Sequence, residues 1–349
     1  MARDLIIDGT RIADDTDCWV IAEIGHNHQG SVEKCKALFD AAKEAGASAV
    51  KLQKRENRSL YTREAFDRPY DHENSFGATY GEHREALEFG WDEYHELKQY
   101  AKELDITFFA TAFDVPSVDF LAELDVPAIK IASGDLKSLY LLEYAARLGK
   151  PLIVSTGVAT IDDVQRAYDT IMPINPQFCL LQCTAAYPPE FDQLDLRVIE
   201  TFRQRFPDVV IGFSSHDNGI AMAMVAYTLG ARVVEKHFTL NRALKGTDHA
   251  FSLEPVGMRK LVRDLRRARV AMGTGEKRVH PSEVSAGVKM GKKIVARHDL
   301  LAGQVLELKD VAMKSPGDGL SPDHLSDVLG RTVQQPLFAD DAVTYDVLD

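Results

Sequence analysis

Eight short apolar runs between residues 19 and 237 constrain the fold more than any other feature of the chain. They are rich in β-branched residues, and they cover 19–24, 48–53, 106–111, 128–132, 152–156, 178–183, 209–214 and 232–237. Nearly continuous hydrophobicity, in place of alternation, is typical of strands that are buried on both faces, as in parallel sheets covered by helices. The runs therefore predict eight parallel strands.

The segments between these runs have helical periodicity and helix-stop signals. In the first of them Ser31 can cap the start and Gly46 the end. Six more segments of this kind follow, at 92–105, 117–125, 138–149, 161–171, 196–206 and 220–230. Strands that alternate with helices eight times predict an α/β protein with a closed (β/α)8 TIM barrel. An open doubly wound sheet is the alternative, because periodicity does not fix closure.

The remaining segments divide the chain into domains. Residues 1–273 form the predicted barrel, which ends with a helix over 255–273, and the polar stretch 274–291 has the composition of a linker. Residues 292–349 predict a small β-rich domain, with β-like pieces at 292–300, 304–314 and 342–348. The segment 54–90 is too long and polar for a simple connection, so we expect it to be a functional loop at the barrel mouth.

The charge of the chain bears on its partners. A net charge of -12 and a pI near 5.4 disfavour nucleic acid and anionic membranes, because both need a basic surface. No stretch approaches the ~18 apolar residues of a membrane span, and the N-terminus does not resemble a signal peptide. We expect a cytoplasmic protein that acts on small molecules.

Two lysines occupy predicted strands where a charge is costly to bury. Lys51 and Lys130 lie in apolar runs, near the strand ends at which barrel enzymes form their active sites. They could form ion pairs with Glu23 or Asp135. We favour an anion site, in which both lysines bind a phosphate and a carboxylate together with nearby hydroxyl groups, which are those of Thr111, Ser133, Ser155 and Ser214.

Two histidines end neighbouring predicted strands. His216 ends the seventh and His237 the eighth, so both imidazoles should reach the same rim, where Glu235 and Asp248 are also available. A single histidine is more often structural, whereas a pair at adjacent strand ends favours a divalent metal site. A metal beside an anion site, with a carboxylate such as Glu23 to move protons, suits carbon–carbon bond formation, sugar isomerisation or a metal aldolase.

At these strand ends the sequence resembles the sialic acid synthase family. The matching motifs are AEIGHNHQG (22–30), VKLQ (50–53), KIASGD (130–135), STG (155–157), QCTAAYP (182–188), IGFSSH (211–216), VEKHFT (234–239) and KGTDHAFSLEP (245–255). The C-terminal module resembles the antifreeze-like (SAF, β-clip) domain of that family. The resemblance implies a lid domain and a domain-swapped homodimer.

The resemblance also implies a reaction. Phosphoenolpyruvate adds through C3 to the open-chain aldehyde of N-acetylmannosamine or its 6-phosphate, water attacks C2, and phosphate leaves by C–O cleavage. The product would be N-acetylneuraminate or its 9-phosphate, and the metal would be Mn²⁺, with Mg²⁺ or Co²⁺ as substitutes.

Roles for individual residues follow from the same motifs. Phosphoenolpyruvate would be bound by Lys51, Thr111, Lys130, Ser133, Ser155 and Ser214. The metal would be bound by His216 and His237, and the sugar by Gln53, Asn74, Tyr187 and Asp248. The catalytic set would be Glu23, Lys51, Lys130, Asp135, His216 and His237.

The chain departs from the family pattern at two positions. Asp135 stands where many bacterial members have glutamate, and Ser315, beside Lys314, stands where many have an arginine that contacts the acyl group. Mannose or a diamino sugar is therefore an alternative acceptor. The competing hypotheses are a synthase of Kdo-8-phosphate or DAHP type, which would lack the C-terminal module, and a non-catalytic sugar-binding barrel.

Overall fold

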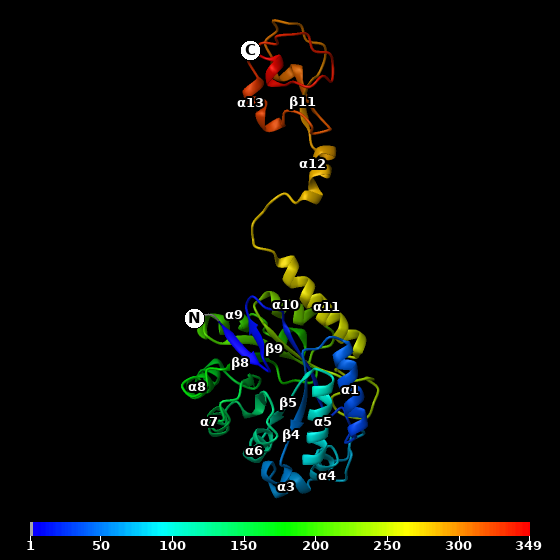
Figure 1. Ribbon diagram of the computed structural model, residues 1–349, viewed down its shortest axis with the longest axis vertical. Coiled ribbons are helices and arrows are strands. Elements are labelled where there is room, and N and C mark those ends of the chain that lie inside the picture. Colours follow the sequence, from blue (N-terminus) through cyan, green and yellow to red (C-terminus); the bar gives the residue numbers. More distant parts are fainter. Residues whose placement is uncertain (1–2) are drawn as a thin grey trace. The chain divides into compact units, whose positions relative to one another are not determined.

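Eight parallel strands close into a barrel in the structure, a computed structural model that describes residues 3–349 (Figure 1). The strands are β3 (Trp19–Gly25), β4 (Ala49–Lys54), β5 (Thr107–Ala112), β6 (Ile129–Ile131), β7 (Leu152–Ser155), β8 (Phe178–Cys183), β9 (Val210–Ser215) and β10 (Val233–His237). The ring closes because β10 pairs with both β9 and β3. The predicted (β/α)8 barrel is confirmed, and the open sheet is excluded.

Strand register brings the polar strand ends together. Glu23 lies opposite Lys51 on one neighbouring strand and opposite His237 on the other. In the same way Thr111 lies opposite Lys130. Since side chains alternate between the two faces of a strand, residues at matching registers enter the barrel interior at similar depth.

Below this polar level the barrel interior is filled with apolar side chains. Trp19 and Phe109 precede Glu23 and Thr111 by an even number of residues, so they point to the same side of their strands. Their rings stack with centroids 5.9 Å apart, and they are only 4% and 0% exposed. The stack forms a closed floor beneath the polar residues.

The helices that cover the barrel match the periodic segments of the sequence. They are α1 (Val32–Glu44), α5 (Trp91–Glu103), α6 (Val115–Glu123), α7 (Leu139–Arg147), α8 (Ile161–Ile171), α9 (Val198–Arg205), α10 (Ala221–Thr228) and α11 (Pro255–Met272). In α8, Thr160 and Asp163 form a capping box, and Val164, Ala167 and Ile171 are buried at helical spacing. This spacing explains why the helix packs one face on the sheet.

An N-terminal hairpin was not predicted. It consists of β1 (Asp4–Ile7) and β2 (Thr10–Ala13), joined by Asp8 and Gly9 at φ 50° and 72°. Two central residues with positive φ are typical of a tight hairpin turn, and Asp-Gly is its common sequence. The Thr107 hydroxyl donates to Asp8 Oδ2 (3.0 Å), which places the hairpin at the N-terminal ends of the barrel strands.

The segment 54–90 contains three short helices: α2 (Asn57–Leu60), α3 (Arg63–Asp67) and α4 (Tyr80–Glu85). Thr79 and Glu82 form a capping box at the start of α4. Figure 1 shows α3 and α4 at the lower end of the barrel, to which the C-terminal ends of the strands point. This segment therefore lies at the mouth of the barrel.

By its internal contacts the chain forms two units, Met1–Met272 and Gly273–Asp349. The second unit contains α12 (Val284–Met290), β11 (Lys293–Ala296), β12 (Val311–Lys314) and α13 (Leu325–Val328). Its own hydrophobic core includes Ile294, Leu306, Val311, Val343 and Val347. The β-like piece 342–348 was only partly right, because Ala342 and Leu348 make isolated bridges while Tyr345–Val347 form a 3-10 turn.

Residues 3–349 include no helix that combines the length and the apolar character needed to cross a membrane.

Candidate active site

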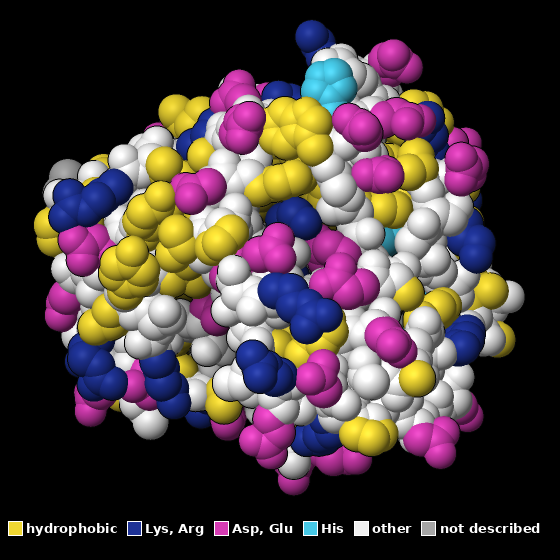
Figure 2. Space-filling view, turned by 90° about the horizontal axis from the view of Figure 1, so that it is seen from below, with side chains coloured by type: hydrophobic (Ala, Val, Ile, Leu, Met, Phe, Trp, Pro, Cys, Tyr) yellow, Lys and Arg dark blue, Asp and Glu magenta, His cyan; other side chains and the backbone are white. Residues whose placement is uncertain are grey.

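A cavity of about 650 Å³ opens at the C-terminal ends of the barrel strands. Figure 2 looks onto this end of the barrel, where acidic and basic side chains lie intermixed and hydrophobic side chains gather to one side. The cavity is lined by all but one of the predicted site residues, namely Glu23, Lys51, Gln53, Asn74, Thr111, Lys130, Ser133, Ser155, Tyr187, Ser214, His216, His237 and Asp248. The barrel therefore brings residues from seven of its strands and five of the loops that follow strands to one place.

Lys51 is one of the buried charged groups of the cavity. Its Nζ is 2.6 Å from Glu23 Oε2 and donates to the Thr111 hydroxyl at 2.7 Å. The side chains of Lys51 and Glu23 are each 2% exposed. The ion pair between Lys51 and Glu23 expected as one alternative is present, and it lies inside the cavity that the anion hypothesis requires.

Lys130 has fewer partners within the protein. Its ammonium donates to the carbonyl oxygen of Ile131 at 3.1 Å and lies 3.9 Å from a Glu235 oxygen. Burial lowers the pKa of Lys130 below its ordinary value, although Glu235 opposes the change. An ammonium has three N–H groups, so Lys130 retains donors for a ligand in the cavity.

Glu235 balances the two lysines. Its carboxylate accepts from the Ser214 hydroxyl at 3.1 Å and lies 3.8 Å from Lys51 Nζ. Burial alone would raise its pKa, but Lys130 and Lys51 outweigh burial and lower it, so Glu235 is ionised. The sequence placed Glu235 near the histidines, whereas in the structure it lies among the lysines because it precedes His237 by two residues along the strand.

Several hydroxyl groups beside the lysines have hydrogens left to donate. The Thr111 oxygen accepts from Lys51, and the Ser133 oxygen accepts from the Gly157 amide at 3.0 Å. The Ser155 hydroxyl is buried and has no hydrogen-bond partner. Buried polar atoms in native proteins are nearly always hydrogen-bonded, so an unpaired hydroxyl at a cavity wall indicates a ligand position.

His216 and His237 meet at the rim, with ring centroids 5.3 Å apart. His216 Nδ1 lies 3.0 Å from the carbonyl oxygen of Thr184, which can only accept, so Nδ1 carries the proton and the Nε2 lone pair is free. Burial, and next the charge of His237, lower the pKa of His216 to about 3, so it is neutral. A neutral imidazole oriented by a carbonyl is typical of a metal ligand.

The donor set near these histidines is small. His237 Nδ1 is buried without a hydrogen-bond partner, 3.6 Å from Asp248 Oδ2. Within residues 3–349 no three or more His, Cys, Asp or Glu side chains are grouped so that they could hold a metal ion. The two imidazoles fit a metal whose other ligands are water and substrate oxygens.

The predicted sugar contacts line the same cavity as the histidines. The Tyr187 ring lies 4.0 Å from that of His216, measured between centroids. Gln53 Nε2 donates to Glu23 Oε1 at 2.7 Å, and Asn74 Oδ1 accepts from the Gly246 amide at 2.9 Å. The segment 54–90 therefore contributes a wall of the cavity through Asn74.

Asp135 is the predicted site residue that does not line the cavity. It ends a 3-10 turn, Ser133–Asp135, that follows β6, and it is not among the residues that line the cavity. Burial raises its pKa to about 6, and one carboxylate oxygen has no hydrogen-bond partner. A direct catalytic contact of Asp135 is therefore not supported by this geometry.

Four polar residues of the cavity wall were not predicted: Arg55, His72, Arg84 and Thr247. Arg55 follows Gln53 by two residues, so strand alternation could have indicated it. Arg84 lies on α4, which is too short to give a periodic pattern, and the sequence contains no signal for its position.

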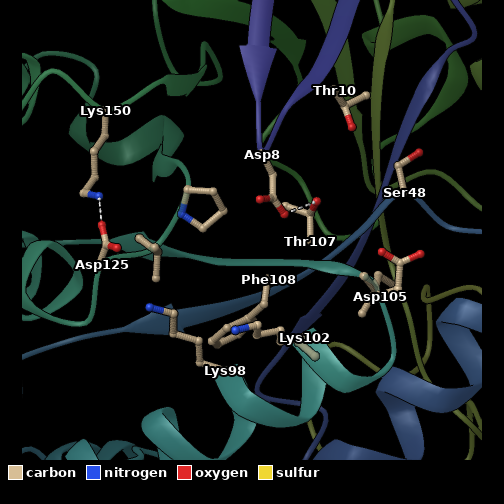
Figure 3. A pocket seen from close by; sticks show the side chains of 14 residues that line it. Asp8, Thr10, Ser48, Lys98, Lys102, Asp105, Thr107, Phe108, Asp125 and Lys150 are labelled. Atoms are coloured by element: carbon tan, nitrogen blue, oxygen red, sulfur yellow. Dashed lines mark hydrogen bonds and ion pairs between the residues drawn. The ribbon is translucent and has the colours of Figure 1, made fainter.

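A second cavity, of about 640 Å³, lies at the opposite end of the barrel (Figure 3). Its lysines have partners within the protein, because Lys150 pairs with Asp125 at 2.6 Å and Lys98 donates to the Leu124 carbonyl at 2.7 Å. In Figure 3 Asp8 and Thr107 face each other across their hydrogen bond. In these contacts the polar groups of the cavity are satisfied by other groups of the protein.

A (β/α)8 barrel whose mouth combines lysines, free hydroxyl groups and two histidines, followed by a small β-containing unit, defines a class of barrel enzymes with a C-terminal accessory domain. Residues 38–277 match the NeuB family, and residues 293–349 match the SAF domain. The chain belongs to the NeuB family, and the resemblance found at the strand ends is confirmed.

Curated relatives and solved structures extend over most of the chain. A human protein named N-acetylneuraminate-9-phosphate synthase is 40% identical and covers 95% of this chain and 93% of its own length. N,N'-diacetyllegionaminic acid synthase of Legionella pneumophila is 34% identical, with 92% of each chain covered. The crystal structure of an N-acetylneuraminic acid (sialic acid) synthetase from Leptospira borgpetersenii, in complex with citrate, has a TM-score of 0.72 and 31% identity, covering 82% of this chain and 95% of that one.

Proposed function

We propose that the protein is a sialic acid synthase that condenses phosphoenolpyruvate with N-acetylmannosamine or its 6-phosphate. The products are N-acetylneuraminate, or its 9-phosphate, and phosphate. The human relative, whose name specifies a 9-phosphate product, supports this substrate pair over a diamino sugar, because it is more similar to this chain than the Legionella relative is.

The observation that carries the proposal is the unsatisfied donors around Lys130. This ammonium has one hydrogen bond, to Ile131, and the Ser155 hydroxyl has none. Phosphoenolpyruvate carries a phosphate and a carboxylate, which together would accept from Lys51, Lys130 and the hydroxyls of Thr111, Ser133, Ser155 and Ser214. Charge-assisted hydrogen bonds of this kind are about twice as strong as neutral ones.

Glu23 is the group that we assign to proton transfer. One of its oxygens lies 2.6 Å from Lys51, on the side of phosphoenolpyruvate, and the other accepts from Gln53, on the side of the sugar. When C3 of phosphoenolpyruvate adds to the aldehyde, the new alkoxide needs a proton and water must add at C2. A carboxylate between the two substrates can accept a proton from that water and pass it to the alkoxide, after which phosphate leaves with the bridging oxygen.

We propose Mn²⁺ as the metal, bound by His216 and His237, with Mg²⁺ or Co²⁺ as substitutes. When bound, such an ion polarises the aldehyde of the acceptor. The support is the free lone pair of His216 and the unpartnered nitrogen of His237. Tyr187 and Asp248, which flank the two rings, then orient the sugar.

We also propose a cytoplasmic homodimer in which the C-terminal unit covers the barrel mouth of a second copy. Support comes from large apolar side chains that are exposed on the segments following β6, β7 and β8, because monomeric proteins seldom expose a large apolar patch. They are Tyr140, Val158, Tyr187 and Phe191. Ser315, which replaces an arginine of many relatives, accepts from Lys292 at 3.3 Å, so N-acyl recognition would rest on other groups.

The deciding experiment combines purified protein, Mn²⁺ and phosphoenolpyruvate with N-acetylmannosamine, its 6-phosphate, mannose and a diamino hexose. Phosphate release that depends on one of the two N-acetylmannosamine compounds is expected. With ¹⁸O in the bridging position of phosphoenolpyruvate, the label should appear in phosphate, because the C–O bond breaks. No acceptor-dependent phosphate with any of these sugars would refute a synthase.

A further inference from the structure

Two arginines on the wall of the mouth cavity have no acidic partner. Arg55 and Arg84 both line the cavity, and no carboxylate of residues 3–349 forms an ion pair with either of them. Arg55 donates to Gln53 Oε1 at 2.7 Å and stacks 3.7 Å above the Phe113 ring. Arg84 donates to the Tyr80 hydroxyl oxygen at 2.7 Å. Glu88 acts on Arg55 and Asp248 acts on Arg84, but neither carboxylate forms an ion pair with its arginine. Both guanidinium groups therefore keep N–H groups that an anion could accept.

The contact that the two arginines share cannot satisfy both of them. Arg55 Nη1 lies 3.1 Å from Nε2 of His26, and Arg84 Nη1 lies 3.3 Å from Nδ1 of the same ring. Burial, followed by the charges of Arg55 and Arg84, lowers the pKa of His26 well below its ordinary value, so the ring is neutral. A neutral imidazole accepts at one nitrogen only. One of the two guanidinium groups therefore faces another donor and has an N–H available for a ligand.

The arginines occupy a defined place relative to the proposed reaction centre. A line of contacts runs from Lys51 to Glu23, from Glu23 to Gln53, and from Gln53 to Arg55, each between 2.6 and 2.7 Å long. His26 continues this line to Arg84. The lysines and the arginines thus form two cationic groups of one cavity, separated by Glu23 and Gln53.

We propose that Arg84, together with Arg55, binds the phosphate of a phosphorylated acceptor sugar, so that the acceptor is a hexosamine 6-phosphate. This inference rests on the proposed function. An open-chain hexose 6-phosphate carries its aldehyde and its phosphate at opposite ends. With the aldehyde beside Glu23 and phosphoenolpyruvate on the lysines, the sugar phosphate lies toward the arginines, whose planar N–H groups match its oxygens.

The test measures kcat/KM of the full chain for N-acetylmannosamine 6-phosphate and for N-acetylmannosamine, at saturating phosphoenolpyruvate. The native protein should prefer the phosphorylated sugar. Arg84→Gln should lower the ratio of the two kcat/KM values about 10- to 100-fold, the range expected when a charge-assisted contact is removed from a partly desolvated site. Arg58→Gln is the matched control, because Arg58 is an exposed arginine of the same segment and does not line the cavity.

Tyr80→Phe is a second variant, which keeps the arginine but removes the hydroxyl that holds it. It should raise KM for the phosphorylated sugar more than it lowers kcat. An unchanged ratio in both variants, or a native preference for the unphosphorylated sugar, overturns the arginine site while leaving the synthase intact. Absence of phosphate release with either sugar refutes the proposed function itself, so the two failures are distinguishable.

Discussion

Lys51 Nζ and Glu23 Oε2 lie 2.6 Å apart in the barrel, and each side chain is 2% exposed. A buried pair of this kind keeps both charges only because each neutralises the other. The same pair lies between the proposed phosphoenolpyruvate and sugar positions, so its chemistry and its contribution to stability are linked.

Glu23→Gln tests this link. It removes one charge of the pair, so it should destabilise the chain by about 3 kcal/mol and lower kcat at least 100-fold through loss of the base. Glu33→Gln, at an exposed position in the first turn of α1, should change neither quantity. Urea unfolding and phosphate release measure the two effects. Retained kcat in Glu23→Gln would remove Glu23 from proton transfer.

His216→Ala should weaken Mn²⁺ binding at least 100-fold, because one of two protein ligands is lost while substrate oxygens are absent. Electron paramagnetic resonance of free Mn²⁺ in a titration measures this without turnover. His95→Ala, at an exposed position of α5, is the control. Equal affinity in the two variants would contradict the metal assignment.

Gly157→Ala should disturb the phosphoenolpyruvate site through Ser133. A Cβ at Gly157 would lie 2.8 Å from Ser133 Oγ and 3.0 Å from the Ala185 side chain, so Ser133 must move. We expect KM for phosphoenolpyruvate to rise several-fold. Because Ser133→Ala removes the same group, the double variant should be no worse than the worse single one. Additive effects would show that Gly157 acts by another route.

Asp135→Asn should change how stability depends on pH. Burial raises the pKa of Asp135 from 3.8 to about 6, so the folded chain holds the proton more tightly than the unfolded chain. Stability is therefore lost as pH rises from about 4 to about 6. The native protein should lose about 1 kcal/mol of its free energy of unfolding over this interval, after allowance for solvent screening of the half-buried group. The variant should not show this loss. Melting temperatures measured across this pH interval test the prediction, with Asp192→Asn at an exposed position as the control. If both variants followed the pH dependence of the native protein, Asp135 would not be the group responsible.

A chain that ends at Gly273 should keep a folded barrel and lose most of its activity. The hydrophobic core of the barrel and that of the C-terminal unit share no buried residue. The barrel should therefore fold, and unfold cooperatively, without the second core. Activity should fall more than tenfold if the C-terminal unit covers the mouth. Calorimetry and phosphate release provide the two measurements, and full turnover in the shortened chain would eliminate the lid.

The helices were predictable because burial of one face imposes a period on the sequence. The eight barrel strands were predictable because burial on both faces gives nearly continuous apolar runs. The strand-end residues from Glu23 to His237 follow from the position of active sites in barrels. The hairpin of β1 and β2 was missed, although Asp8-Gly9 was a local signal. Arg84 could not have been found, since its position depends on contacts with His26 and Tyr80, which are not encoded in any local pattern. The catalytic role of Asp135 stays a prediction from the motif KIASGD, because the residue lies in a 3-10 turn and does not line the cavity.

The stacked rings of Trp19 and Phe109 lie in the barrel interior beneath the polar residues of the cavity. Lys51 and Lys130 of the cavity are 2% and 3% exposed, whereas Arg84 is half-buried, so we expect the arginine to be nearer the entrance. A sugar bound at the arginines would block access to the lysines. Binding is therefore ordered, with phosphoenolpyruvate before the sugar. Labelled phosphoenolpyruvate bound in advance should then be captured as product when excess unlabelled substrate and sugar are added together, whereas labelled sugar bound in advance should wash out.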